Sequence, residues 1–555
     1  MFKMSNPVFG LLSGVFWFAC SPQAVQVESG PVRPGTVIIG LSQEPDSLFV
    51  PFKEMMVSEE IVRIGNYTLT IFNENWDLIP WAAKEIPTLA NGGLQLFIEN
   101  GAKKMRTTWK IRDDFFWADG KPLVADDFIL NYEITQDPTQ EVIDRTSIEA
   151  IEKMEQKDPK TLVITWKEHY AYYHNYRNHE ALPAHIIGPI YRANPEKLKQ
   201  HEFGQQPLLA GAFTIHQWLP GETIRARRNL FAKGKHRPKL DEIIWRIIPQ
   251  TNTLESNLVA GDIDAISSVG LDLDQALNFQ KRFGKDYHFY FTPGLLWEHI
   301  DFNLDNPILQ DKRVRQALAY GANRAKIADL LFAGKQPVAH GTEPEKSPFY
   351  NADVRKYAYD VSRANQLLEE AGWLLSKPKE IRRKNGKPLK LVLMSTSGNK
   401  SRERVEQLLQ AEWRKIGVEI EIKNQPAKVF FSETVHKRRF QHMALYSWVK
   451  DPVKLSDTLW RCDHIPRESN SFLGQNIPGF CDAKVDQLLK SASLELNVLK
   501  RIRLGQELEA VLAEELPALP LYFRVEVTIT KKGLKNWKPT GILQPVTWNA
   551  HEWSW

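Results

Sequence analysis

The chain has 555 residues, of which 43% are apolar and 25% are charged. This length exceeds what one hydrophobic core sustains, so two or three domains are expected, with the composition of an ordinary globular protein. The 72 basic and 67 acidic residues leave a net charge of only +5. Because no basic cluster dominates a segment, the sequence gives no support for nucleic-acid binding.

The N-terminus has the features of an export signal. A charged start, Met1–Lys3, precedes the apolar run Pro7–Ala19, which is too short to cross a bilayer and therefore predicts a secretory signal over residues 1–20. The run ends in F-A-C-S, which resembles a bacterial lipobox with Cys20 as the lipidated residue. An ordinary signal peptide cleaved nearby is the alternative. Residues 21–35 are polar and predict a tether.

Beyond Cys20 the chain has two cysteines, Cys462 and Cys481. An even number of cysteines in an exported protein predicts a disulfide bond. This bond would close a loop of about 20 residues and stabilise the fold by roughly 3 kcal/mol on the chain-entropy model. A metal site is disfavoured, because neither a C-x-x-C motif nor paired histidines accompany them.

Segments with strand and helix periodicity follow one another along the rest of the chain. Strands are predicted at Thr36–Leu41, Thr108–Arg112, Leu162–Trp166, Ile243–Ile248, Leu389–Leu393, Val418–Ile422 and Pro520–Phe523, and a hairpin at Asn66–Pro80. Capping residues mark helix starts at Asp126-Asp127, Asp311, Asn323 and Asp360, and glycines mark helix ends at Gly261, Gly372 and Gly417.

The strands at 389–393 and 418–422 flank one helix, from about Ser401 to Ile416. This order predicts a βαβ unit, which requires a parallel sheet with both faces covered. Ser395–Gly398 follows the first of these strands. Open α/β sheets bind their ligands at this edge.

Motifs of common catalytic and cofactor sites are absent from the sequence: G-x-S-x-G, H-E-x-x-H, the P-loop and G-x-G-x-x-G. Four histidines, His169, His174, His179 and His185, are spaced five, five and six residues apart, which does not place two metal ligands on one helical face. The pair Asp126-Asp127 suits a helix cap better than acid–base chemistry. No enzyme, cofactor or metal is therefore predicted.

Several segments carry motifs of one family. They read W-A-D-G-K-P-L-V-A-D-D-F at 117–128, L-E-S-N-L-V-A-G-D-I-D at 254–264, R-Q-A-L-A-Y-G-A-N-R-A-K-I at 315–327, and P-L-Y-F at 520–523. In this order they resemble the family 5 extracellular solute-binding proteins, the oligopeptide-, dipeptide- and nickel-binding receptors of ABC importers. Trp117, Phe128 and Asn323 depart from the usual residues but keep their apolar or capping character.

The resemblance implies an α/β, two-lobed periplasmic-binding-protein-like fold of class II, of the large oligopeptide-binding type. Lobe I would comprise residues 36–68, 208–292 and 518–555, with an extra subdomain at 69–207, and lobe II residues 293–517. Two chain crossings near 292 and 517 would form a hinge, so that lobe closure buries a ligand.

The implied function is that of a monomeric extracytoplasmic receptor. It would hold a solute, in the first place a short peptide, and deliver it to an ABC permease from the periplasm or cell envelope, anchored there through a lipid. A receptor of this fold for a nickel chelate, a sugar or another solute is the alternative, followed by a secreted hydrolase. A receptor binds one equivalent of ligand and releases it unchanged, whereas an enzyme converts it.

Peptide receptors of the family hold the ligand's ammonium group with an aspartate in a segment like W-x-x-D-x-x-D-P. Residues 446–452 read Y-S-W-V-K-D-P here. Asp451 is therefore either the ammonium partner or only the turn aspartate of the D-P pair, and both remain open. The residues that the resemblance places at the ligand are Tyr446, Trp448, Asp451, Trp297 and Asn303.

Overall fold

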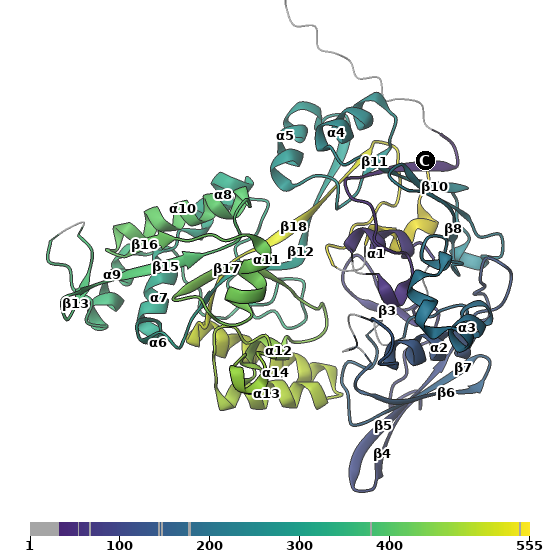
Figure 1. Ribbon diagram of the computed structural model, residues 1–555, viewed down its shortest axis with the longest axis horizontal. Coiled ribbons are helices and arrows are strands. Elements are labelled where there is room, and N and C mark those ends of the chain that lie inside the picture. Colours follow the sequence, from purple (N-terminus) through teal and green to yellow (C-terminus); the bar gives the residue numbers. More distant parts are fainter. Residues whose placement is uncertain are drawn as a thin grey trace, which may run out of the picture.

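The computed structural model describes residues 33–53, 55–65, 68–142, 145, 148–175, 179–377, 380–542 and 545–555. It shows two lobes side by side (Figure 1). The predicted signal peptide, most of the tether and Cys20 lie outside the described residues. Among those that are described, no helix combines the length and apolar character needed to cross a membrane.

One mixed sheet of ten strands runs through both lobes, in the order β16-β15-β17-β12-β18-β11-β1-β10-β9-β8. Its strands in chain order are β1 (Thr36–Leu41), β8 (Phe213–Leu219), β9 (Thr223–Arg228), β10 (Glu242–Ile247), β11 (Ala265–Ile266), β12 (Tyr287–Phe302), β15 (Lys390–Met394), β16 (Glu419–Ile422), β17 (Met443–Val449) and β18 (Ala518–Lys531). We call the part built on β1 and β8–β11 lobe I, and the part built on β15–β17 lobe II.

Strands β12 and β18 connect the lobes. They pair antiparallel from Tyr287 opposite Lys531 to Asp301 opposite Ala518, with irregularities between Pro293 and Trp297 and between Glu298 and His299. The lobe I half of β18 also pairs with β11, and the lobe II half of β12 pairs with β17. In Figure 1 the yellow strand β18 runs from one lobe to the other. Both strands continue through the junction without a break, so the structure does not mark a boundary at a single residue. The domain boundaries expected near 292 and 517 therefore stay a prediction.

Helices cover both faces of the sheet in lobe I. Helices α4 (Thr251–Ala260) and α5 (Leu273–Phe283) pack on one face, in a core that includes Leu254, Phe279 and Ile529. Helix α1 (Met56–Val62) and the C-terminal 3-10 segment η9 (Val546–Glu552) belong to the core on the other face. As predicted, α4 ends at Gly261, whose φ of 81° lies in the left-handed region.

Lobe II contains the predicted βαβ unit. Strands β15 and β16 are parallel neighbours, and α10 (Lys400–Lys415) connects them. Around them lie α6 (Pro307–Gln310), α7 (Lys312–Gly321), α8 (Arg324–Phe332), α9 (Val361–Glu370), α12 (Asp457–Trp460), α13 (Ala483–Leu494) and α14 (Val498–Glu515). The side chains of Asp311, Asn323 and Asp360 cap α7, α8 and α9, which confirms the predicted helix starts.

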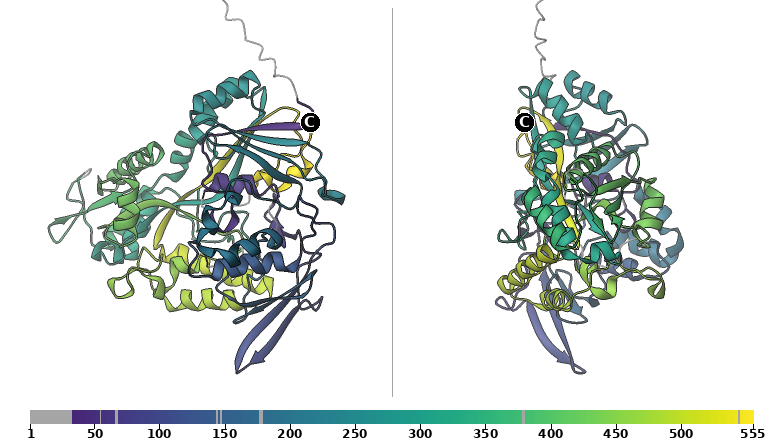
Figure 2. Two further views of the ribbon diagram at one scale, coloured as in Figure 1. Left: turned by 45° about the vertical axis from the view of Figure 1, so that its right-hand side comes forward. Right: turned by 90° about the vertical axis from the view of Figure 1, so that its left-hand side faces the viewer.

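A smaller antiparallel sheet and two helices form the extra subdomain. Its strands are β4 (Leu94–Glu99), β5 (Ala102–Lys110), β6 (Ile151–Asp158) and β7 (Thr161–Trp166), in the order β4-β5-β7-β6. Helices α2 (Ala125–Gln136) and α3 (Ala184–Ala193) accompany them, and the short strands β2 (Thr70–Phe72) and β3 (Leu78–Pro80) form the predicted hairpin. The β4–β5 hairpin projects from the body in every view (Figures 1 and 2).

Candidate ligand site at the junction of the lobes

Strand β17 brings two of the predicted residues, Tyr446 and Trp448, to one face of the sheet. The Tyr446 hydroxyl donates a hydrogen bond to Asp301, and the side chain is buried. Trp448 is only half-buried. Its ring lies 5.8 Å from that of Tyr446, so the two side chains form an aromatic row in which Trp448 is the more exposed.

Phe431 extends this row. Its ring lies 6.0 Å from the Tyr446 ring, and 42% of its surface is exposed. It belongs to η6 (Phe430–Val435), a π-helical turn that follows α11 (Ala427–Val429). Such turns are frequent at functional sites. The sequence analysis did not find Phe431, because the F-F-S-E-T-V segment carries no motif.

Trp297 and Asn303 are part of the lobe II interior. Trp297 lies opposite Trp448 in the sheet, is fully buried and stacks on the His299 ring at 4.0 Å. The Asn303 amide donates to the Phe440 carbonyl at 2.6 Å and accepts from the Asp305 N–H at 3.0 Å. Since packing and the local turn use both side chains, their geometry does not support the predicted ligand contacts.

The two carboxylate oxygens of Asp451 have different hydrogen-bond partners. Oδ1 accepts the backbone N–H groups of Val453 and Lys454, each at 2.9 Å, which is the turn role left open by the sequence. Oδ2 accepts from Nδ2 of Asn175, in the extra subdomain, at 3.1 Å. One oxygen therefore builds the D-P turn, and the other lies where the two lobes meet.

The neighbouring Lys450 points away from this place. Its side chain is buried and pairs with Glu343 at 2.8 Å. Glu509 lies beside this pair. Burial raises the pKa of Glu509 to about 7, and the charge of Glu343 contributes to the same shift. Lys450 therefore does not neutralise Asp451.

A loop of the extra subdomain reaches lobe II next to Asp451. The Ala171 N–H donates to the Ser493 carbonyl at 2.9 Å. The Tyr172 side chain is buried in a hydrophobic cluster with Leu455, Leu459 and Trp460. The lobes are thus in contact on this side of the junction.

A buried charge cluster lies on the other face of the connecting strands. Glu298, on β12, accepts from Arg402 of α10 at 3.0 Å and from Arg524 of β18. Burial opposes ionisation, but Arg524 and Arg402 together keep the pKa of Glu298 below its ordinary value. Arg402 also donates to Thr396 at 3.1 Å, in the loop that the sequence placed at the ligand edge of the sheet.

Two further carboxylates, Glu60 on α1 and Glu526 on β18, belong to the same region. Glu60 is 1% exposed; one of its oxygens accepts from Ser268 at 3.4 Å, and the other has no hydrogen-bond partner among the described residues. Burial raises the pKa of Glu60 to about 7. Burial raises the pKa of Glu526 to about 8, and the charge of Glu60 contributes to the same shift. The sequence analysis did not find these residues, although the R-V-E-V sequence at 524–527 places charges at alternate positions of an apolar strand.

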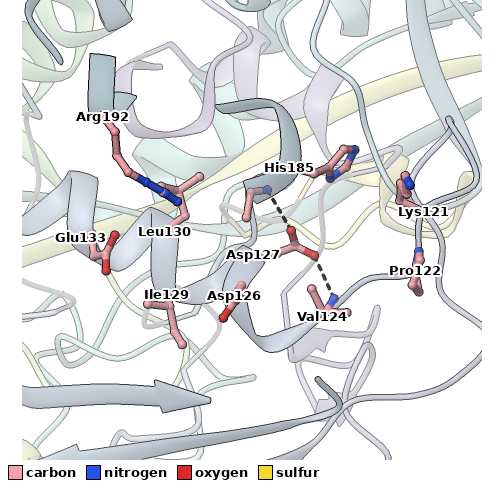
Figure 3. A pocket seen from close by; sticks show the side chains of 11 residues that line it. Lys121, Pro122, Val124, Asp126, Asp127, Ile129, Leu130, Glu133, His185 and Arg192 are labelled. Carbon is pink, nitrogen blue, oxygen red and sulfur yellow. Dashed lines mark hydrogen bonds between the residues drawn. The ribbon is translucent and has the colours of Figure 1, made fainter. Parts of the chain in front are cut away.

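A separate pocket of about 520 Å³ lies between α2 and α3 (Figure 3). At its base Asp127 accepts the N–H groups of Val124 and Ala184 at 2.8 and 2.9 Å and Nε1 of Trp117 at 3.0 Å. Asp127 therefore caps α2, as predicted, and ties it to α3. Its oxygens are engaged within the extra subdomain, so we do not assign the ligand to this pocket.

The cysteines and histidines considered in the sequence analysis are engaged in structural contacts or buried. Cys462 and Cys481 are joined by a disulfide of 2.11 Å. His179 is buried, which lowers its pKa to about 3, and His185 pairs with Asp119 at 2.7 Å. Within the described ranges, no group of three or more His, Cys, Asp or Glu side chains is arranged to hold a metal ion.

Comparison with known proteins shows which families and structures this chain resembles. The family model "Bacterial extracellular solute-binding proteins, family 5 Middle" matches residues 77–467. The oligopeptide-binding protein AppA of Bacillus subtilis is 26% identical over 92% of each chain. The nickel-binding periplasmic protein of Escherichia coli is 25% identical over 67% of this chain and 66% of its own length.

Among solved structures, the oligopeptide-binding protein of Thermus thermophilus in complex with a pentapeptide is 29% identical, with a TM-score of 0.68. The similarity covers 94% of this chain and 97% of that one. The expected two-lobed binding-protein fold is thereby confirmed. The motifs, the fold and the family match over most of the chain agree. This chain therefore belongs to the family 5 bacterial extracellular solute-binding proteins.

Proposed function

We propose that this protein is the extracytoplasmic receptor of an ABC importer, which holds a short peptide between its lobes and delivers it to a membrane permease. The observation that carries the proposal is the junction itself. Asp451 and Trp448, from one end of β17 and the turn after it, lie beside a contact with the extra subdomain. The relatives named as oligopeptide-binding proteins support a peptide as the ligand class.

In the proposed complex the peptide ammonium group pairs with Oδ2 of Asp451 and takes the place of the Asn175 amide. An apolar side chain of the peptide packs against Trp448 and Phe431. Oδ1 of Asp451 remains in its turn, which holds the carboxylate in a fixed orientation. A preoriented carboxylate loses little side-chain entropy when it binds a charged group.

A non-peptide solute is the second candidate, because one relative is a nickel-binding protein. Mass spectrometry of the solute that co-purifies with the protein separates these possibilities without prior choice of ligand. Calorimetry with that solute, after stripping, should give one equivalent bound, and the solute should be recovered unchanged. A converted solute would contradict the receptor function, and a bound metal chelate or sugar would contradict the peptide class.

A further inference from the structure

The residue before Asp451 is a lysine whose side chain is enclosed by lobe II. Lys450 is 1% exposed, and its ammonium group pairs with Glu343 at 2.8 Å. Lysine is almost never fully buried unless a partner offsets the loss of hydration. The pair therefore holds the Lys450 side chain in a fixed position.

Glu343 is itself held in place by a buried hydrogen-bond network. Its carboxylate accepts from the Ser347 hydroxyl at 2.8 Å, and its backbone N–H donates to Glu509 of α14 at 3.2 Å. Glu509 also accepts the backbone N–H and the hydroxyl of Thr342, at 2.7 and 2.6 Å. All four of these residues are buried. The network therefore fastens Lys450 to a long helix of lobe II.

Lys450 lies where the chain leaves the sheet. Strand β17 ends at Val449, and the Lys450 N–H donates to the Leu295 carbonyl at 2.9 Å. Oδ1 of Asp451 then accepts N–H groups of its own turn. These bonds fix the carboxylate relative to the turn, whereas the Lys450 side chain fixes the turn relative to lobe II. A binding group on a loop needs such support from the residues around it.

We propose that Lys450 is a positioning residue for the ammonium site: through its pair with Glu343 it holds the Asp451 carboxylate in the orientation that binds the ligand. Its own side chain is buried and does not contact the ligand. Charge and position have opposite effects here. A lysine that acted only through its charge would weaken ammonium binding at the next residue, whereas one that orients Asp451 strengthens it. This inference rests on the proposed peptide-receptor function.

The test is calorimetry on the full mature chain, stripped of bound solute, with Ala-Phe-Ala and N-acetyl-Ala-Phe-Ala. The ratio of the two affinities measures how strongly the ammonium group is recognised. Wild type should bind the free peptide at least about ten-fold more tightly than the acetylated one, as a charge-assisted hydrogen bond provides. Lys450→Met should reduce this ratio by about three-fold to ten-fold, because the ligand must then order the carboxylate itself.

A double variant separates the positioning role from a role in folding alone. Lys450→Met leaves Glu343 buried without its cation and should lower the Tm. The double variant Lys450→Met with Glu343→Gln removes both charges and should regain most of this Tm. It should nevertheless keep the reduced affinity ratio, because the turn remains unattached. If Lys450→Met does not fold, the double variant carries the test.

Lys484→Met is the matched control. Lys484 also pairs with a glutamate of α14, Glu507, at 2.8 Å, but both side chains are more than half exposed. Loss of this pair should therefore leave the affinity ratio unchanged.

Each alternative outcome is distinct. An unchanged or larger ratio in Lys450→Met would overturn the positioning role, while the peptide receptor stands. Recovery of the ratio together with the Tm in the double variant would leave the pair a role in folding alone. If wild type binds the free and the acetylated peptide equally, Asp451 recognises no ammonium group and Lys450 has none to position. If neither peptide binds, the proposed function fails, and this inference with it.

Discussion

Asn175 and Asp451 connect the extra subdomain with lobe II through a hydrogen bond of 3.1 Å from the amide Nδ2 to the carboxylate Oδ2. The two residues are 276 positions apart in the chain. The donor on Asn175 occupies the position that we propose for the ammonium group of the ligand.

Asp451→Ala should weaken peptide binding by about ten-fold to a hundred-fold, because it removes the charged acceptor of the ammonium group. Calorimetry on stripped protein measures this. Asp463→Ala is a suitable control, since Asp463 is exposed and pairs with Arg461. Equal affinity with and without Asp451 would leave this residue only its role in the turn.

The carboxylate pair Glu60 and Glu526 should make the ligand-free protein less stable as the pH rises. Their folded pKa values, about 7 and about 8, lie above the ordinary value of 4.5. Their contribution to stability is therefore complete below about pH 4.5 and is lost as the pH rises through about 7 and 8. Glu526→Gln should reduce the fall in Tm between about pH 6 and about pH 9, by on the order of 1–3 °C.

The titration of other nearby groups is not expected to produce this dependence of the Tm on pH. The charged groups around the pair are Glu298, which is bonded to both Arg524 and Arg402, and the Glu59–Arg63 pair on α1. Glu298 and Glu59 both have lowered pKa values, so they stay ionised throughout this range. Identical pH profiles for wild type and Glu526→Gln would show that Glu526 does not titrate there.

Arg402→Met should destabilise the protein by about 3 kcal/mol, since it leaves Glu298 buried with one cation instead of two. The matched control is Arg404→Met on the same helix. Arg404 pairs with Asp274 across the lobes at 3.2 Å, but both side chains are largely exposed, so its loss should cost less than about 1 kcal/mol. Urea unfolding of both variants gives the comparison, and equal losses would be inconsistent with a special role for the buried cluster.

Cys462 and Cys481 should resist alkylation in the native oxidised protein and react after reduction. Replacement of both by serine should lower the free energy of unfolding by roughly 3 kcal/mol on the chain-entropy model. Mass spectrometry of the alkylated protein counts the free thiols. Labelling of both cysteines without reductant would contradict the disulfide.

Cys20→Ser should move the protein from the membrane fraction to the soluble fraction, because the lipid on Cys20 is its proposed anchor. Immunoblots of fractionated cells measure this, and sequencing of the mature N-terminus is the complementary check. Unchanged fractionation, or a mature chain that begins at another residue, would favour an ordinary cleaved signal peptide.

The sequence by itself predicted the elements whose signals are local. Asp311, Asn323 and Asp360 cap their own helices through N–H groups two or three residues away. Gly261 ends α4 through its own backbone conformation, and the order strand-helix-strand at 389–422 predicted a parallel pair. The motifs added the family and the two-lobed fold, because they occur in a fixed order along the chain.

Only the tertiary structure decided which of the predicted site residues remain available to a ligand. Trp297 and Trp448 are both tryptophans on neighbouring strands, yet one is fully buried and the other half-buried, because other parts of lobe II cover them differently. Glu60 and Glu526 show no pattern that joins them in the sequence. The charge of Glu60 influences Glu526 because β18 returns to lobe I and the C-terminal segment packs on α1, where Thr547 bonds the Glu60 carbonyl across 487 residues. Contacts over such separations depend on the path of the whole chain, which local propensities do not encode.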